Sequence, residues 1–304
     1  MNIVCCIDRN YVMPAGVMIT SVCLNNAEAD ITFHVVCNPN VRQGDKDDLR
    51  AVVEKYGKRI AFYGVDEKLC RDFTVGKEGQ PRHITIATYY RLLLPLILPE
   101  EIDRVLYLDS DIVVRGDIAP LYNADIEDVA VGAVTDTSEG NITMFNRLRY
   151  SERLGYFNAG VLLVNLRYWR EHNILQECLD FALNYSERVK FHDQDILNYV
   201  LRERKRRLPL TYNFQDGFMY NIATISLEKY ERELLAAEKD PIVIHYVTTK
   251  PWYKKCAHPY KDEFIKYKAL TKWSKQRLVP YSVKDIVKIL LRIQLISPYK
   301  QIKR

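Results

Sequence analysis

The stretch RVLYLDSDIVVRGDI, residues 104–118, carries an apolar run directly into two aspartates, Asp109 and Asp111. The apolar and aromatic residues before Asp109 are typical of a buried strand. Two carboxylates separated by one residue, Ser110, repel each other unless a cation lies between them. Hard divalent cations prefer carboxylate oxygens, so the pair indicates a metal site at a strand end.

Two other interpretations fit the same stretch. Aspartate is common in turns after strands, so the pair can be purely structural. LDSDIV also matches the first motif of haloacid dehalogenase-type phosphatases, with Asp109 as nucleophile and Asp111 as acid/base. That motif usually lies on the first strand of its fold, whereas three strand-like segments precede it here. A P-loop enzyme is excluded because the chain contains no GxxxxGK[ST] motif.

The segments around the aspartates alternate between strand and helix patterns. Residues 2–8, 32–38 and 59–66 read as strands, with helical spacing between them. Residues 84–99 predict a helix that ends before Pro95. This alternation predicts βαβ units and a mostly parallel sheet.

Polar residues follow several of the expected strands. Asp8, Asp109, Asp111, Asp136 and His245 each come at or near the end of an apolar run. Open α/β sheets bind ligands at the carboxyl ends of their strands. We therefore expect these side chains to converge on one site.

Composition and charge limit the cellular context. The seven cysteines form no CxxC pair, which indicates reduced thiols rather than disulfides or a zinc site. Asp8 and Arg9 interrupt the apolar N-terminal run, and no stretch approaches the ~20 apolar residues of a membrane-spanning helix. We predict a cytoplasmic protein. Residues 272–304 carry a local net charge of +8 within a total of +5, so the remainder is acidic and a nucleic-acid partner is not expected.

Further motifs lie in order along the chain: IVCCIDRNY (3–11), RHITIATYYRL (82–92), YFNAGVLLVNLRYWR (156–170), HDQDILN (192–198) and HYVTTKPW (245–252). With the two aspartates, they resemble glycosyltransferase family 8. The resemblance is to the bacterial lipooligosaccharide galactosyltransferase and glucosyltransferase type, with glycogenin more distant, and it extends from Met1 to about residue 260.

The resemblance implies a GT-A fold, which is an α/β, Rossmann-like, nucleotide-binding mixed sheet with flanking helices. The GT-A catalytic domain is expected over residues 1–260, and a basic, amphipathic, small helical extension over 261–304. The family also implies a UDP-sugar donor, a manganese ion and retention of anomeric configuration. Asp109, Asp111 and His245 resemble the metal ligands. Their mixed carboxylate and imidazole set suits Mn²⁺ better than Mg²⁺, which stays the alternative.

The other family positions are carried over by motif. The residues that resemble the uridine pocket are Cys6, Asp8, Asn10 and Tyr11. Those that resemble the rest of the donor site are His83, Ile84, Arg91, Ser110, Asn158, Ala159 and Lys250. The catalytic candidates beside the sugar are Gln194, Asp193 and Asp136. The family's last motif often contains a glycine before its lysine, but HYVTTKPW has none, so Thr248 or Thr249 is expected to contribute a hydroxyl instead.

The function implied is a retaining, Mn²⁺-dependent hexosyltransferase. It would move glucose or galactose from a UDP-sugar to a saccharide acceptor on a glycolipid, a cell-surface polysaccharide precursor or a glycoprotein. An amide is a poor nucleophile, so Gln194 favours front-face attack over a covalent intermediate. The alternatives are the phosphatase and a non-catalytic nucleotide-sugar-binding protein.

The basic tail allows two interpretations. Lys284, Lys288 and Arg292 form a stripe along a helical pattern in residues 282–296. The segment can be a terminal helix docked on the domain. Alternatively, it can lie on the anionic inner face of the membrane, which predicts a peripheral membrane association and a lipid-linked acceptor.

Overall fold

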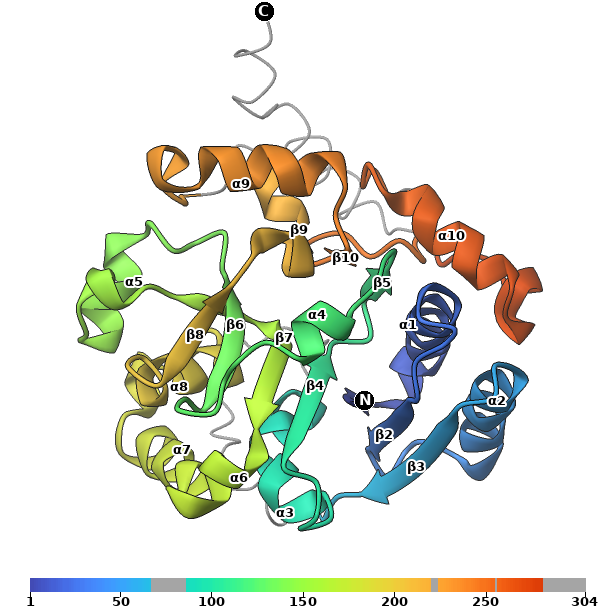
Figure 1. The fold of residues 1–304 in the computed structure, drawn as a ribbon, viewed down its shortest axis with the longest axis horizontal. Coiled ribbons are helices and arrows are strands. Elements are labelled where there is room, and N and C mark those ends of the chain that lie inside the picture. Colours follow the sequence, from blue (N-terminus) through green and yellow to red (C-terminus); the bar gives the residue numbers. More distant parts are fainter. Residues whose placement is uncertain (67–85, 220–223, 255, 281–304) are drawn as a thin grey trace, which may run out of the picture.

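The computed structural model describes residues 1–66, 86–219, 224–254 and 256–280 (Figure 1). The first third alternates strands and helices: β1 (Asn2–Ile7), η1 (Arg9–Tyr11), α1 (Val12–Asn25), β2 (Thr32–Cys37), α2 (Gln43–Lys55) and β3 (Arg59–Gly64). The middle contains η3 (Ile86–Leu93), α3 (Leu94–Ile97), β4 (Arg104–Leu108), β5 (Ile112–Val114), α4 (Ala119–Tyr122), β6 (Val131–Thr135), α5 (Ile142–Leu148), η4 (Glu152–Leu154), β7 (Phe157–Asn165), α6 (Leu166–Glu171) and α7 (Ile174–Asn184). The last third contains η5 (Ser186–Arg188), α8 (His192–Val200), β8 (Lys205–Leu208), η6 (Leu210–Asn213), β9 (Phe214–Gln215), η7 (Asp216–Met219), α9 (Leu227–Lys239), β10 (Val243–His245), α10 (Lys261–Ala269) and η8 (Lys272–Lys275).

A seven-stranded mixed sheet forms the centre, in the order β3-β2-β1-β4-β7-β6-β8. The strands β3, β2, β1 and β4 run parallel to one another, and β7 runs antiparallel to both β4 and β6. One apolar layer packs α1, α2 and α9 on one face, and a second packs η3, α6, α7 and α8 on the other (Figure 1). This arrangement confirms the predicted α/β class with a mixed sheet and flanking helices.

A small second sheet, β5-β10-β9, brings the two halves of the site together. The chain leaves β4, passes through Asp109 and Asp111, and enters β5. Strand β10 pairs antiparallel with β5, and its register places His245 opposite Ile112. The imidazole therefore lies next to the second aspartate although 134 residues separate them in sequence.

Pro95 does not end a helix as predicted. The 3₁₀ helix η3 runs up to Leu93, and α3 begins at Leu94 with Pro95 in its first turn. Proline is tolerated there because the first N–H groups of a helix have no intrahelical acceptor.

The chain after residue 260 packs on the body as far as it is described. Phe264 and Tyr267 of α10 share an apolar cluster with Val17 of α1. The Tyr267 hydroxyl accepts a hydrogen bond from Asn25 Nδ2 at 2.8 Å. Gly16 faces the Trp273 ring so closely that a Cβ there would lie 2.1 Å from it. The basic amphipathic segment 282–296 lies outside the described residues.

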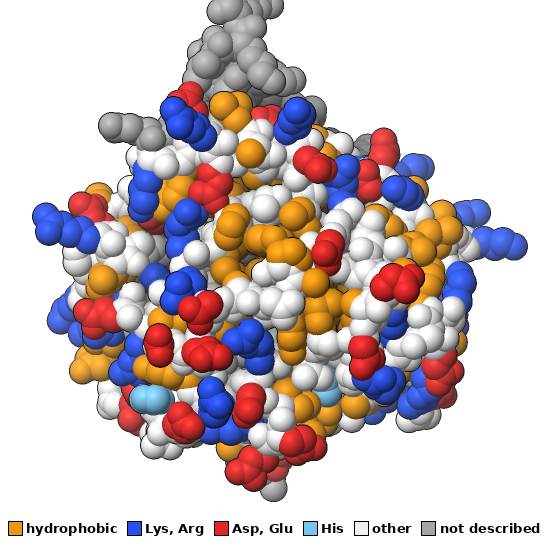
Figure 2. All heavy atoms as spheres, viewed as in Figure 1, with side chains coloured by type: hydrophobic (Ala, Val, Ile, Leu, Met, Phe, Trp, Pro, Cys, Tyr) orange, Lys and Arg blue, Asp and Glu red, His pale blue; other side chains and the backbone are white. Residues whose placement is uncertain are grey.

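The surface seen in Figure 2 mixes charges of both signs. Hydrophobic side chains gather on this face between α9 and α4, with charged side chains around them. No helix in the described part of the chain has the length and apolar character needed to cross a membrane.

His34 links three strands through its two ring nitrogens. Its Nε2 lies 3.1 Å from Asn2 Oδ1 on β1, and its Nδ1 lies 2.9 Å from the Tyr63 hydroxyl on β3. The ring is buried, and burial lowers its pKa to about 4. In the unfolded chain the same group would titrate near ~6.5.

We expect the free energy of unfolding to fall as pH is lowered from ~6.5 to ~4. In this range His34 takes up a proton in the unfolded chain but stays neutral in the folded protein, so protonation favours unfolding. One such proton changes the free energy of unfolding by up to about 1.4 kcal/mol per pH unit. Urea denaturation across this range should show a shallower decline for His34→Gln than for wild type. The exposed His172→Gln is the control. Identical slopes for wild type and His34→Gln would contradict this assignment.

Candidate active site

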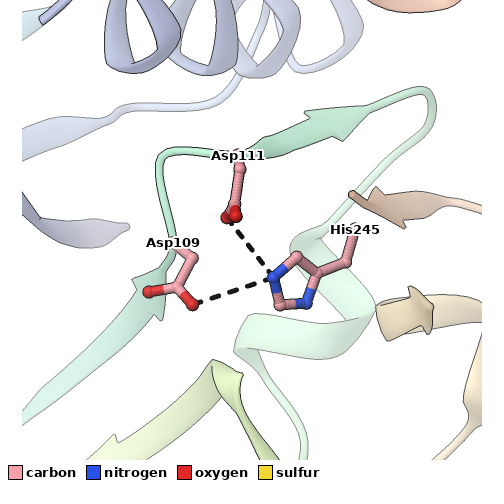
Figure 3. Close-up of side chains that lie close together, drawn as sticks. All are labelled: Asp109, Asp111 and His245. Carbon is pink, nitrogen blue, oxygen red and sulfur yellow. Dashed lines mark ion pairs between the residues drawn. The ribbon is translucent and has the colours of Figure 1, made fainter. Parts of the chain in front are cut away.

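Three potential metal ligands converge where the two sheets meet (Figure 3). His245 Nε2 lies 3.3 Å from Asp111 Oδ1 and 3.7 Å from Asp109 Oδ2. One ligand atom from each of the three residues falls within 4.8 Å of the others. A single divalent cation can contact all three.

His245 is oriented by a chain of amides. Its Nδ1 lies 2.9 Å from Asn213 Oδ1, and Asn213 Nδ2 donates to Asn158 Oδ1 at 2.9 Å. A carbonyl oxygen can only accept, so Nδ1 carries the proton and the lone pair sits on Nε2, facing the carboxylates. This is the tautomer that a metal-ligating histidine requires.

Asp109 is held by two donors from its far side. The Tyr107 hydroxyl donates to Asp109 Oδ1 at 2.7 Å, and Arg91 Nη2 lies 3.0 Å from the same oxygen. Arg91 is buried, stacks on the Tyr107 ring and donates from Nη1 to the Ala159 carbonyl at 2.5 Å. It is therefore not the plain surface charge that its helical position would also allow.

Arg91 also faces Asp193. The Asp193 Oδ2 atom lies 2.9 Å from Arg91 Nε, but that N–H is directed at the Thr88 carbonyl, so this contact is Coulombic. Burial raises the pKa of Asp193 to about 7, against the opposing effect of Arg91. Asp193 is thus a buried carboxyl group that stays protonated to a higher pH than an ordinary aspartate.

Asp111 is paired with Lys250. The ammonium group donates to Asp111 Oδ2 and, at 2.7 Å, to the Tyr246 carbonyl. Burial by itself would raise the pKa of Asp111, but the Lys250 ammonium holds it well below its ordinary value. The carboxylate stays ionised, as a metal ligand must.

Two further observations fit a cation at this position. Gly160 on β7 makes room for both ligands, because a Cβ there would lie 2.2 Å from His245 Cε1 and 2.8 Å from Asp109 Oδ2. The buried Ser110 hydroxyl between the aspartates has no hydrogen-bond partner among the described residues. A small, open, oxygen- and nitrogen-lined position suits Mn²⁺.

The sugar-side candidates form one hydrogen-bonded group. Gln194 Oε1 accepts from the Ala159 amide at 3.0 Å and from Asn158 Nδ2 at 3.3 Å. Gln194 Nε2 donates to Asp136 Oδ2 at 3.2 Å, and Asn158 Nδ2 donates to the same oxygen at 3.0 Å. Both ends of the Gln194 amide are engaged, so the side chain is positioned rather than free.

Two cavities open on the carboxylates. The smaller, about 140 Å³, is lined by Cys6, Asp8, Tyr11, Ala87, Thr88, Arg91, Tyr107, Asp109, Ser110 and Asp111. The larger, about 410 Å³, is lined by Arg91, Asp109, Asp111, Asp136, Thr137, Ser138, Tyr156, Asn158, Ala159, Gly160, Phe191, His192, Asp193, Gln194, His245, Val247, Thr248 and Lys250. The structure therefore brings most of the sequence-predicted residues to one cleft at the strand ends.

Among the described candidates, one residue lies outside both cavities. Asn10 is exposed and lines neither cavity, although its amide donates to Asp8 Oδ1 at 2.8 Å. His83 and Ile84 fall outside the described residues. Tyr11 lines the smaller cavity and meets the Trp252 ring edge-on at 5.7 Å.

The threonines of HYVTTKPW face a residue that the motifs did not single out. Buried Asp216 accepts from the Thr248 hydroxyl, and from the amides of Thr248 and Thr249 at 3.1 and 3.3 Å. In this structure, the Thr248 hydroxyl is thus engaged by a carboxylate. Asp216 ties the segment before Lys250 to the body.

Asp195 was also missed, although it lies inside the HDQDILN motif. Its fully buried carboxylate accepts two bonds from Arg147, at 2.7 and 3.0 Å, and one from the Tyr156 hydroxyl at 2.8 Å. The amides of Lys190 and Phe191 donate to it at 2.7 and 2.6 Å. Asp195 thereby anchors the segment that presents Asp193 and Gln194.

A Rossmann-like mixed sheet with two strand-end carboxylates and a facing imidazole beside a cleft is the arrangement of GT-A glycosyltransferases. Comparison with known proteins agrees: the family described as Glycosyl transferase family 8 matches residues 2–256. The chain belongs to glycosyl transferase family 8.

Individual relatives cover nearly the whole chain. General stress protein A of Bacillus subtilis is 30% identical over 90% of this chain and 95% of its own length. The lipopolysaccharide 1,3-galactosyltransferase of Salmonella typhimurium is 28% identical, over 90% of this chain and 79% of its own. The crystal structure of the galactosyltransferase LgtC in complex with donor and acceptor sugar analogues superposes with a TM-score of 0.78 at 29% identity, over 90% of this chain and 96% of that chain.

The resemblance to family 8 is thus confirmed, and the two alternatives are not supported. The phosphatase interpretation relied on the LDSDIV motif alone. In the structure Asp109 follows the fourth strand of the chain, and its Oδ1 contacts Tyr107 and Arg91. The non-catalytic interpretation finds no support in relatives whose names describe transferases.

Gly160→Ala should weaken Mn²⁺ binding at least tenfold, because the new methyl group displaces His245 and Asp109 from their shared position. Mn²⁺ affinity can be measured from the free-ion electron paramagnetic resonance signal. Gly64→Ala on β3 is the control, since no atom lies within 4 Å of its added Cβ. Wild-type Mn²⁺ affinity in Gly160→Ala would show that the cation binds elsewhere.

Asp195→Asn should lower the free energy of unfolding by about 3 kcal/mol, because Arg147 and two amides lose a buried charged acceptor. Chemical denaturation measures this change. Glu177→Gln, which removes the exposed pair with Arg204, should cost at most about 1 kcal/mol. Equal effects of the two substitutions would contradict the anchoring role.

Proposed function

We propose that the protein is a retaining hexosyltransferase that moves glucose or galactose from a UDP-sugar to a saccharide acceptor, with Mn²⁺ as its metal. The observation that carries this proposal is the convergence of Asp109, Asp111 and His245 beside two cavities that share both aspartates in their lining. Lipopolysaccharide galactosyl- and glucosyltransferases among the relatives support the hexose and the saccharide acceptor.

The smaller cavity suits the nucleoside of the donor. Tyr11 offers an aromatic face for a base, and the buried Asp8 carboxylate offers an acceptor for a base N–H. Its far wall consists of Asp109 and Asp111, so a diphosphate attached to the nucleoside would extend toward the proposed metal position.

The diphosphate would meet two sources of positive charge. A bound Mn²⁺ supplies charge beside the leaving diphosphate. The Lys250 ammonium donates to Asp111 and to the carbonyls of Tyr246 and Val247, and these bonds hold its positive charge on the same side. Both stabilise the charge that develops as the bond to the sugar breaks.

The sugar would lie in the larger cavity against the group formed by Asp136, Asn158 and Gln194. The Gln194 oxygen already accepts two N–H bonds, which makes this amide a still poorer nucleophile. This geometry supports front-face attack, in which the leaving phosphate helps to remove the acceptor's proton. Gln194 then acts by positioning the sugar.

We also propose a cytoplasmic location. The six described cysteines are free thiols, which is typical of a reducing compartment. Peripheral contact with the inner membrane face would depend on the tail beyond residue 280.

A screen of UDP-sugars for Mn²⁺-dependent hydrolysis tests the proposal. UDP-glucose or UDP-galactose should turn over, and proton NMR should first detect the α-anomer of the released sugar. Asp111→Asn should reduce turnover below detection, whereas Gln194→Ala should lose about 10- to 10³-fold. The exposed Asp128→Asn should behave as wild type. Full turnover in the presence of a chelator, or release of the β-anomer first, would contradict the proposal.

A further inference from the structure

A third cavity, about 410 Å³, lies at the β8 edge of the main sheet. Its walls come from β6, the segment from η4 into β7, the chain just after α8, β8 and the beginning of α9 (Figure 1). The cavity is separate from the metal position, but Tyr156 lines both it and the sugar-side cavity.

The cavity is strongly basic. Five cationic and two acidic side chains line it: Arg153, Arg202, Lys205, Arg207, Lys229, Glu139 and Glu203. Two of the cations are neutralised, because Arg207 pairs with Glu233 at 2.8 Å and Lys229 pairs with Glu139 at 3.2 Å. No carboxylate in the described part of the chain pairs with the other three, Arg153, Arg202 and Lys205.

Lys205 occupies an unusual position for an unpaired cation. It is half-buried against the Phe157 ring, and its ammonium donates to the Gly155 carbonyl at 2.9 Å. Burial lowers its pKa to about 8, although Glu139 acts against the shift. An ammonium has three N–H donors, and the described residues account for one.

Gly155 supplies the carbonyl that holds the Lys205 ammonium. Its φ of +67° is the left-handed region that favours glycine, and a Cβ there would lie 3.4 Å from Glu139 Oε1. Its carbonyl accepts from both Lys205 and the Tyr150 hydroxyl, the latter at 3.2 Å. The lysine is thus held at a defined point instead of extending into solvent.

We propose that this cavity binds an anionic group, a phosphate or a carboxylate, carried by the saccharide acceptor. Two guanidinium groups and one ammonium match the oxygens of such a group. The volume suits a sugar ring with its substituent.

The shared Tyr156 places this cavity beside the sugar-side cleft, so one acceptor chain can occupy both. The acceptor assignment rests on the proposed function, whereas the binding of an anionic sugar does not. The site would make the enzyme prefer acceptors in which one sugar unit carries a negative charge and a different unit carries the reacting hydroxyl.

The test uses glucose 6-phosphate, glucuronate, glucose and inorganic phosphate as probes, with binding measured by calorimetry. Glucose 6-phosphate or glucuronate should bind wild type at least tenfold more tightly than glucose or inorganic phosphate. Arg153→Gln, an exposed position, and Lys205→Met should each weaken that binding at least tenfold. Lys250→Met, in the metal cleft, should leave it unchanged.

Arg206→Gln is the matched control, because Arg206 lies between Lys205 and Arg207 on the same strand but faces the other side of the sheet. It should bind the anionic sugars as wild type does. Equal loss in Arg206→Gln, no loss in Arg153→Gln, or loss in Lys250→Met would overturn the site. Equal affinity for inorganic phosphate and for the anionic sugars would overturn the saccharide assignment. Tighter binding of phosphatidylglycerol vesicles than of the sugars, through the same residues, would also overturn it.

Mn²⁺-dependent UDP-glucose and UDP-galactose hydrolysis, measured on wild type in parallel, separates this inference from the proposed function. Absence of hydrolysis together with Lys205-dependent sugar binding would refute the transferase but retain the anion site. Hydrolysis without such binding would refute the anion site alone.

Discussion

The rest of the site depends on the repulsion between two carboxylates held at the bend between β4 and β5. Asp109 and Asp111 each need positive charge nearby, and the fold supplies it from opposite sides. Arg91 reaches Asp109 from η3, and Lys250 reaches Asp111 from the segment after β10. The space that remains between them faces the lone pair of His245 and is kept open by Gly160. Since Arg91 and Lys250 already offset the two carboxylates, a divalent cation in that space would leave the site with a net positive charge, as an anionic diphosphate requires.

Hydrogen bonds carry this constraint from the metal position to the sugar side. Asn213 sets the His245 tautomer and also contacts Asn158, which donates to Asp136 beside Gln194. Because these amides share donors and acceptors, a displacement at one of them is transmitted to the others. The proposed metal ligands and the proposed sugar-side residues are therefore parts of one network.

Much of the fold was predictable from short stretches of sequence. The spacing of apolar residues distinguishes strands from helices, and polar residues mark the strand ends. The convergence of Asp109, Asp111 and Asp136 follows because the carboxyl ends of strands in an open α/β sheet form the ligand-binding edge. What the sequence could not show was long-range pairing: β10 joins a separate sheet with β5, and the Asn213–His245 contact spans 32 residues. Asp195 was overlooked although it lies in a quoted motif, because a buried structural carboxylate and a catalytic one look alike in sequence. The predicted helix end before Pro95 is wrong because proline is also tolerated in the first turn of a helix, where it lies here.

We infer that His245 and the two aspartates bind one cation. Electron spin echo envelope modulation of Mn²⁺ bound to the protein with UDP tests this inference, because the method detects nitrogen bonded to the metal. We predict the signal of one coordinated imidazole nitrogen, which disappears in His245→Gln while the exposed His172→Gln keeps it. Tightly bound Mn²⁺ without any coordinated nitrogen would contradict the account.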